Sequence, residues 1–288
     1  MTEFLKVLLL GIVEGITEWL PVSSTGHLIL VDEFVKLGAS EAFKEMFEVV
    51  IQLGAIMAVV VLYWGQLFPF GKKNNPHPLS AEGAGAYIKT DIFKMWFKVL
   101  VACIPAAVIG LIFDDLFNAL FYNWQTVAVM LILFGIIFII AEKRNRTRKP
   151  VFNSIAEMPY CVAVMIGAFQ LIAAVFPGTS RSGATIVGAL LIGVSRKVAA
   201  EFTFYLAVPV MFGASLLKLV KFFAESGQMS GAEAGMLIVG MVVAFAVSIF
   251  IIRFMMSYIK KHDFTVFGWY RIVLGVLVML YFGLVGKS

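Results

Sequence analysis

Residues 21–27 read Pro-Val-Ser-Ser-Thr-Gly-His and interrupt an apolar stretch that begins near residue 4. A second apolar stretch, residues 159–176, runs in the same way into residues 177–183, which read Pro-Gly-Thr-Ser-Arg-Ser-Gly. After each break the chain resumes as an apolar segment. Broken backbone cannot face lipid, because its free N–H and C=O groups need partners, but it is tolerated inside a protein or along a cavity. The two stretches therefore predict two re-entrant helix pairs.

The composition of the remaining chain is that of a membrane protein. Of the 288 residues, 61% are hydrophobic and 14% are charged, whereas a soluble domain carries roughly 25% charged residues. Six further segments are long and apolar enough to cross a hydrocarbon core of roughly 30 Å. They are residues 43–64, 93–113, 119–141, 200–224, 233–256 and 266–286. We expect an all-α, polytopic integral membrane protein that forms a single membrane domain.

An internal repeat relates the two halves of the chain. Pro21 and Pro177 lie 156 residues apart, and so do Ser24 and Ser180. Each half then holds one re-entrant pair and three spans, and since three is odd, the second half enters the membrane from the opposite side. We expect an inverted repeat of residues 1–142 and 157–288, joined by a basic linker at 143–156. The two broken segments would meet near the middle of the membrane.

The distribution of Lys and Arg predicts the orientation of this repeat. Loops 65–92 and 142–156 share one side with the connections near residues 196 and 260, and this side holds most of the cations. Cytoplasmic loops are enriched in Lys and Arg, so this side is predicted to be cytoplasmic. Both termini and the mouth of the first re-entrant pair then face outward. Such loops also explain the net charge of +5, and we expect no nucleic-acid partner.

Two carboxylates precede the first break. Glu14 and Glu18 are four residues apart, so a helix places both on one face. A charged side chain at membrane depth costs roughly 2.5–3.5 kcal/mol on insertion scales, so the pair needs a partner, water or a metal ion. The alternative is a solvated pair at the membrane interface.

Three hydroxyl side chains lie between these carboxylates and His27. Hydroxyls beside a histidine and carboxylates are the ingredients of a nucleophile, a general base and an orienting group. The alternative is a helix cap and turn, because Ser and Thr also cap helix N-termini. The hydroxyls belong to Ser23, Ser24 and Thr25.

The second break contains Arg181 in an apolar neighbourhood, where a cation needs an anionic partner. The forked donors of a guanidinium match two phosphate oxygens, and the helix that follows points N–H groups at an anion. The alternative is an internal ion pair with Glu14 or Glu18. Both interpretations hold if a substrate competes for Arg181.

Two motifs carry a family resemblance. Residues 14–28, Glu-Gly-Ile-Thr-Glu-Trp-Leu-Pro-Val-Ser-Ser-Thr-Gly-His-Leu, and residues 177–185 resemble the signature motifs of the bacterial undecaprenyl-diphosphate phosphatase family, also called bacitracin-resistance proteins. Residues 47–54 resemble a third family segment, and Trp19 stands where Phe is commoner. The resemblance covers nearly the whole chain. It implies hydrolysis of a C55 isoprenoid diphosphate in the bacterial cytoplasmic membrane, which regenerates the lipid carrier of peptidoglycan precursors and confers bacitracin resistance.

The resemblance and the residues together predict the active site. The expected catalytic residues are Glu18, Ser24, His27 and Arg181. The expected substrate-binding residues are Glu14, Ser23, Thr25, Gly26, Gly178, Thr179, Ser180 and Ser182.

In the expected mechanism, Arg181 and nearby N–H groups hold the diphosphate oxygens. Ser24 attacks the terminal phosphorus, activated by His27. Glu18 orients His27 or, with Glu14, holds Mg²⁺ or Ca²⁺, which prefer oxygen ligands. Direct attack by His27 and attack by a metal-bound water remain alternatives. From a different class, a transporter or flippase of isoprenoid lipid phosphates shares this inverted architecture. Expected partners are the lipid diphosphate, membrane lipid and a second copy in a homodimer.

Overall fold

A computed structural model describes residues 2–71, 75–80, 82–226 and 228–285. Within these ranges the chain is helical, and β-structure is limited to isolated bridges such as Phe152 with Val194. The helices are α1 (Glu3–Thr17), α2 (Ser24–Phe34), α3 (Glu41–Val50), α4 (Gln52–Leu62), α5 (Trp64–Leu67), α6 (Thr90–Phe121), α7 (Trp124–Asn145), α8 (Tyr160–Val175), α9 (Arg181–Ile192), α10 (Arg196–Ser226), α11 (Gly231–Tyr258) and α12 (Thr265–Val285), with a 3-10 turn η1 (Gly83–Tyr87) before α6.

Six helical segments of the described residues are long and apolar enough to cross a membrane. They overlap the six predicted spans, so the prediction of an all-α, multi-pass membrane protein is confirmed. Besides shifts of a few residues at the span ends, two differences stand out. The third span begins at Trp124 rather than at residue 119, because α6 continues to Phe121 and the Asn123 side chain caps α7 by accepting from the Thr126 N–H at 2.8 Å. The first span consists of two helices, α3 and α4, which meet at Ile51.

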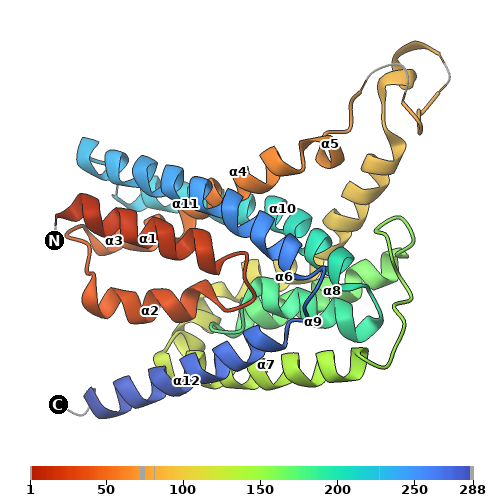
Figure 1. The fold of residues 1–288 in the computed structure, drawn as a ribbon. Coiled ribbons are helices and arrows are strands. Elements are labelled where there is room, and N and C mark those ends of the chain that lie inside the picture. The colour runs from red at the N-terminus through yellow and green to blue at the C-terminus, as the bar shows by residue number, and fades with distance from the viewer. Residues whose placement is uncertain (1, 72–74, 81, 227, 286–288) are drawn as a thin grey trace.

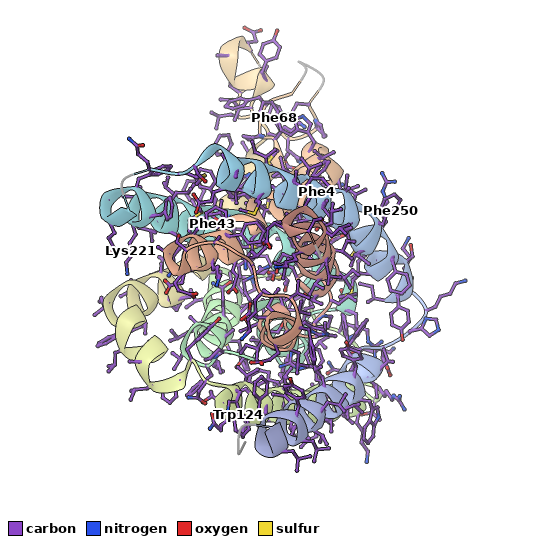
Figure 2. All side chains as sticks on the ribbon, turned by 90° about the vertical axis from the view of Figure 1, so that its left-hand side faces the viewer. Phe4, Phe43, Phe68, Trp124, Lys221 and Phe250 are labelled. Carbon is purple, nitrogen blue, oxygen red and sulfur yellow. The ribbon has the colours of Figure 1, made fainter. Side chains whose placement is uncertain are left out.

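The outer surface of the helices is apolar. Phe4 is 56% exposed and Phe250 is 71% exposed, whereas Phe43 is fully buried. Figure 2 views the molecule from the end where the termini lie, and Phe250 projects from its periphery. Soluble monomers rarely expose contiguous apolar patches larger than a few hundred Å². The surface therefore matches a hydrocarbon environment.

Two helical hairpins, α1–α2 and α8–α9, extend into the molecule from opposite ends (Figure 1). At the open end of the first, the Gly38 N–H donates to Glu3 Oε2 at 2.8 Å. At the open end of the second, the Val151 N–H donates to the Gly193 carbonyl at 2.8 Å. Their closed ends, residues 18–23 and 176–180, meet in the middle, where Ser182 Oγ donates to the Glu18 carbonyl at 3.2 Å.

Long helices surround the two hairpins. Helix α1 packs against α11, α8 packs against α6, and α7 packs against both α12 and α9. Next to the first closed end, Trp19 is fully buried and meets Phe204 of α10 edge-on, with ring centroids 5.3 Å apart. The irregular backbone of the closed ends is therefore enclosed by protein, where its polar groups can be satisfied.

Candidate active site

Each closed end contains a serine with an unusual backbone. Ser23 has φ 75° and Ser180 has φ 69°, and they are the non-glycine residues with positive φ in the described chain. Each caps the helix that follows: Ser23 Oγ accepts from the Gly26 N–H at 3.3 Å, and Ser180 Oγ accepts from the Gly183 N–H at 3.1 Å. Positive φ is uncommon outside glycine and persists where the surroundings enforce it.

The two caps correct the predicted alignment of the repeat. Ser180 is the structural equivalent of Ser23, so its predicted pairing with Ser24 was wrong by one residue. The physical reason is loop length, because Pro177 is separated from its capping serine by one more residue than Pro21 is.

The N-termini of two helices converge at this junction. Helix α2 begins at Ser24 and α9 begins at Arg181, directly after the two closed ends. The first N–H groups of a helix have no partner within it and carry a partial positive charge. Two such ends side by side favour an anion such as phosphate.

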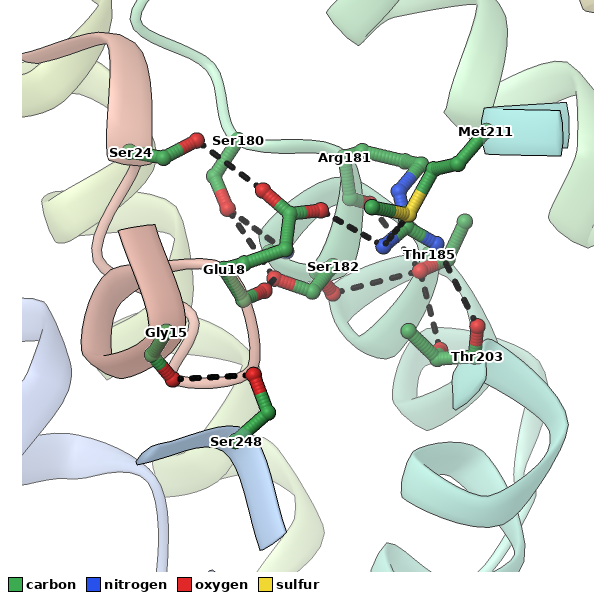
Figure 3. A network of polar contacts seen from close by, with 11 residues as sticks. Gly15, Glu18, Ser24, Ser180, Arg181, Ser182, Thr185, Thr203, Met211 and Ser248 are labelled. Atoms are coloured by element: carbon green, nitrogen blue, oxygen red, sulfur yellow. Dashed lines mark hydrogen bonds and ion pairs between the residues drawn. The ribbon is translucent and has the colours of Figure 1, made fainter. Parts of the chain in front are cut away.

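A carboxylate joins the two hairpins (Figure 3). Glu18 Oε1 accepts from Arg181 Nη2 at 2.7 Å, and Glu18 Oε2 accepts from Ser24 Oγ at 3.0 Å. The side chains of Arg181 and Glu18 are 13% and 9% exposed. The internal ion pair that the sequence left open is therefore present, and it is formed with Glu18. The structure brings Glu18, Ser24 and Arg181 together as predicted.

Further contacts fix the guanidinium of Arg181. Its Nη1 donates to the Thr203 carbonyl at 3.4 Å, and its Nη2 lies 3.3 Å from the Met211 sulfur. The Thr203 hydroxyl in turn bonds the Thr185 hydroxyl at 2.9 Å. Helix α10 therefore orients the forked donors of Arg181 toward the junction.

His27 has other partners than those predicted. Its Nδ1 lies 2.7 Å from the Ser23 carbonyl and its Nε2 lies 2.7 Å from the Tyr270 hydroxyl, while the two rings stack. A carbonyl only accepts, so Nδ1 carries the proton, and neutral Nε2 accepts from Tyr270. The predicted contacts of His27 with Ser24 and with Glu18 are wrong for this state, because both ring nitrogens are occupied and Ser24 donates to Glu18 instead.

Sequence reasoning missed Arg271, on α12. It is fully buried, and its guanidinium donates to the carbonyls of Pro21 at 3.3 Å, Gly178 at 2.9 Å and Thr179 at 2.7 Å. It therefore ties the two closed ends together. Arg271 could have been found from sequence, because it is a lone cation inside the apolar span 266–286. The same argument identified Arg181.

Gly178 is one of the residues whose backbone carbonyl binds Arg271. Its φ is +89°, and a Cβ atom there would lie 2.6 Å from the Val127 carbonyl oxygen. Only glycine combines this φ with so close an approach to α7. The structure therefore explains Gly178 by geometry, and its carbonyl accepts from Arg271 at 2.9 Å.

The other predicted binding residues lie in or beside the two loops. Gly26 packs against Leu131 and uses its N–H for the Ser23 cap. Thr25 lies half-buried in the first turn of α2. The hydroxyl of Thr179 is buried without a partner in the described chain. The structure thus gives Ser23, Gly26 and Ser182 structural contacts within the loops.

Glu14 lies one helical turn before Glu18 and is fully buried. Both of its oxygens lack a hydrogen-bond partner in the described chain. Unpaired buried carboxylate oxygens fit a hard divalent cation. No group of three or more His, Cys, Asp or Glu side chains suited to a metal occurs among the described residues. Glu14 and Glu18 are therefore the side chains that would hold such a cation.

Comparison with known proteins agrees with this geometry. The family model described as "Bacitracin resistance protein BacA" matches residues 7–277. The Undecaprenyl-diphosphatase of Desulfitobacterium hafniense is 62% identical over 282 residues, which cover 98% of this chain and 97% of the relative. Undecaprenyl-diphosphatase 1 of Clostridium acetobutylicum is 60% identical over 280 residues, 97% of each chain. An Enterococcus faecalis relative with the same activity in its name is 59% identical over 278 residues, 96% of each chain.

Proposed function

Because this chain belongs to the BacA family of bacitracin resistance proteins, we propose that it hydrolyses undecaprenyl diphosphate to undecaprenyl phosphate and inorganic phosphate. The proposal rests on relatives of about 60% identity over nearly the full chain and on the site at the hairpin junction. Hydrolysis of this lipid in the membrane recycles the carrier of cell-wall precursors and confers resistance to bacitracin.

The main structural support for the mechanism is that the carboxylate of Glu18 binds both Ser24 and Arg181. Glu18 accepts from Ser24 at 3.0 Å and from Arg181 at 2.7 Å. The three side chains supply a hydroxyl, a proton acceptor and a phosphate-binding cation within one hydrogen-bonded group. This is the minimal set for phosphoryl transfer to a protein side chain.

Substrate binding would rearrange this group. The terminal phosphate competes with Glu18 for the forked donors of Arg181, and the free N–H groups at the start of α2 and α9 favour the same anion. When Arg181 turns to the phosphate, Glu18 loses a cationic partner and becomes a better proton acceptor. Binding therefore activates Ser24 by removing the cation from its base.

The proposed reaction has two steps. Ser24 Oγ transfers its proton to Glu18 and forms a bond to the terminal phosphorus, while the bond from that phosphorus to the bridging oxygen breaks. Undecaprenyl phosphate leaves with the bridging oxygen and its electron pair. Glu18 passes the Ser24 proton to the oxygen of this leaving group and is ionised again. Water then gives a proton to Glu18 and attacks the phosphoserine; the bond from phosphorus to Ser24 Oγ breaks, Oγ recovers that proton from Glu18, and inorganic phosphate is released. Arg181 and the helix N-termini stabilise the negative charge on the equatorial oxygens in both steps.

Two further residues would support this chemistry. His27 fixes the Ser23 turn through its 2.7 Å contact with the Ser23 carbonyl and thereby places Ser24. Glu14, with Glu18, would hold Mg²⁺ or Ca²⁺, which when bound neutralises phosphate charge. Direct attack by His27 is disfavoured in this geometry because both of its ring nitrogens already have partners.

We also propose that the two hairpins are re-entrant and belong to an inverted repeat, residues 1–142 and 157–288, within one membrane domain. Their entry from opposite ends and the meeting of their closed ends support this arrangement (Figure 1). Linker 143–156 lies at the end opposite the termini. Its cations favour a cytoplasmic location, which would open the first hairpin to the outer side of the bacterial cytoplasmic membrane.

Trapping the intermediate tests the proposal. Purified protein in detergent, mixed with undecaprenyl diphosphate labelled in the terminal phosphate, should release phosphate and form a labelled protein on rapid acid quench. A phosphoserine at Ser24 survives acid, whereas phosphohistidine does not. An acid-labile label would transfer the nucleophile role to His27, and absence of any label with normal turnover would favour attack by water. Absence of phosphate release would favour a transporter.

A further inference from the structure

A cavity of about 680 Å³ lies at the end of the molecule opposite the termini. It is formed by the C-terminal ends of α7, α9 and α11, the N-terminal end of α10, and the linker at residues 148–151. Its volume lies in the range of ligand-binding clefts, roughly 300–1,000 Å³. Helix α9 separates it from the active site, because Arg181 begins this helix and Ile192, which lines the cavity, ends it. Eleven residue steps of about 1.5 Å place the two ends about 17 Å apart.

The walls of this cavity are strongly basic. Six Lys and Arg side chains from three separate segments line it, against a single carboxylate, Asp263. Arg146 pairs with Asp263 at 2.9 Å. The cations that have no ion-pair partner in the described chain are Arg148, Lys149, Lys260 and Lys261.

Arg196, one of the cations that line the cavity, is already held in one orientation by hydrogen bonds before any ligand binds. Arg196 Nε donates to both oxygens of the fully buried Glu142, each at 3.0 Å, and Glu142 also accepts from the Phe264 N–H at 3.1 Å. Arg196 uses its Nε and Nη2 for Glu142, so its Nη1 remains available to a ligand. A cation held in one orientation loses less entropy when it binds an anion.

The floor of the cavity is apolar and rigid. It is lined by side chains from the end of α9 and by Ile259, which is almost fully buried. Backbone hydrogen bonds close it: the Val151 N–H donates to the Gly193 carbonyl at 2.8 Å, and the Ser195 N–H donates to the Phe152 carbonyl at 3.0 Å. A basic rim over an apolar floor matches a ligand with an anionic head and an apolar attachment.

We propose that this cavity binds the phosphate-bearing headgroup of an anionic membrane lipid. Basic pockets between transmembrane helices recognise such headgroups through their phosphate. A lipid is favoured over a free phosphate because the cavity lies where membrane-spanning helices end and because its floor is apolar. The site is separate from the hydrolytic site and does not depend on the proposed function, since the two share no residue.

Charge-matched variants test this proposal. The cavity variant carries Arg148→Gln, Lys149→Gln, Lys260→Gln and Lys261→Gln. The control variant removes the same number of exposed cations at the same end outside the cavity, with Lys94→Gln, Lys143→Gln, Arg144→Gln and Arg253→Gln. Full-length protein in detergent is titrated separately with phosphatidylglycerol, with phosphatidylcholine and with inorganic phosphate, and native mass spectrometry counts the bound molecules. Phosphate release from undecaprenyl diphosphate verifies that both variants are folded.

We expect the cavity variant to bind phosphatidylglycerol at least tenfold more weakly than the unmodified protein, and the control variant to bind it within twofold. Phosphatidylcholine should bind equally weakly to all three. An equal loss in both variants would overturn the proposal, because general surface charge would then explain binding. Inorganic phosphate that binds in the absence of any phosphatidylglycerol binding would also overturn it, and would identify a site for free phosphate.

Discussion

Replacing Ser24 with alanine removes a single oxygen atom from the hairpin junction. That oxygen makes one hydrogen bond, to Glu18 Oε2 at 3.0 Å, from a half-buried side chain at the start of α2. A hydrogen bond to a charged group contributes about 1.5–3 kcal/mol when buried, and partial exposure places this one near the lower end. The variant should therefore fold and insert.

The expected loss of activity is much larger than the loss of stability. If Ser24 is the nucleophile, its removal leaves only binding and electrostatic stabilisation, and turnover should fall by at least about 10³-fold, or about 4 kcal/mol in the barrier. Phosphate release from undecaprenyl diphosphate by purified protein, measured at saturating substrate, gives this number directly.

Ser23→Ala is the matched control, because it deletes the same atom one residue earlier. The Ser23 hydroxyl is buried and caps α2 through the Gly26 N–H. Its loss should cost about 0.5–2 kcal/mol of stability and reduce turnover less than about tenfold, far below the effect of removing a nucleophile. Refutation is simple: a Ser24→Ala protein that retains a tenth or more of normal turnover has another nucleophile.

Three further predictions address the cation, the orientation and the metal. Arg181→Lys should reduce turnover by about 100-fold or more, because an ammonium cannot reproduce the fork, and near-normal kinetics would contradict the phosphate clamp. In a background without native cysteines, a cysteine at position 148 should resist an impermeant thiol reagent in intact cells while one at position 228 reacts; the reverse labelling would invert the orientation. EDTA should lower turnover, and Glu14→Gln should raise the Mg²⁺ concentration for half-maximal activity by about tenfold or more. Turnover unchanged by EDTA would remove the metal from the mechanism.

Hydropathy and chain breakers were sufficient to predict the six membrane spans and the two helical hairpins, but not every helix boundary. An apolar segment is recognisable from local composition alone, and Pro21 and Pro177 mark the ends of α1 and α8 because proline disfavours a helical conformation of the residue before it. Pro105 and Pro209 nevertheless lie inside α6 and α10. The division between α3 and α4 at Ile51 was missed because neither proline nor glycine lies at that position. The predicted alignment of Ser24 with Ser180 was wrong because it assumed that the loops after Pro21 and Pro177 have equal length.

The site was predictable where a charged side chain lies in an apolar segment, because the free-energy cost of burying it indicates a function. A carboxylate and a guanidinium in apolar segments each require a partner, so an ion pair of Arg181 with Glu14 or Glu18 could be predicted from sequence. The structure shows that the partner is Glu18, 163 residues away. The partner of His27 could not, because Tyr270 lies 243 residues away on a helix with no distinguishing pattern. Adjacent hydroxyls suggested that His27 activates Ser24, whereas α12 packs against α2 and places the Tyr270 hydroxyl at Nε2 of His27.

Arg271 has a consequence for biosynthesis. The residues proposed to react lie at the end of α1 and at the starts of α2 and α9, but the guanidinium that joins their loops lies on α12, which leaves the ribosome after these three helices. Chains are completed from the N-terminus, so a nascent protein carries Glu18, Ser24 and Arg181 before it has the tie between them. Catalytic competence should therefore appear only when α12 has inserted. A product of premature termination before α12 would contain every reacting residue and remain inactive.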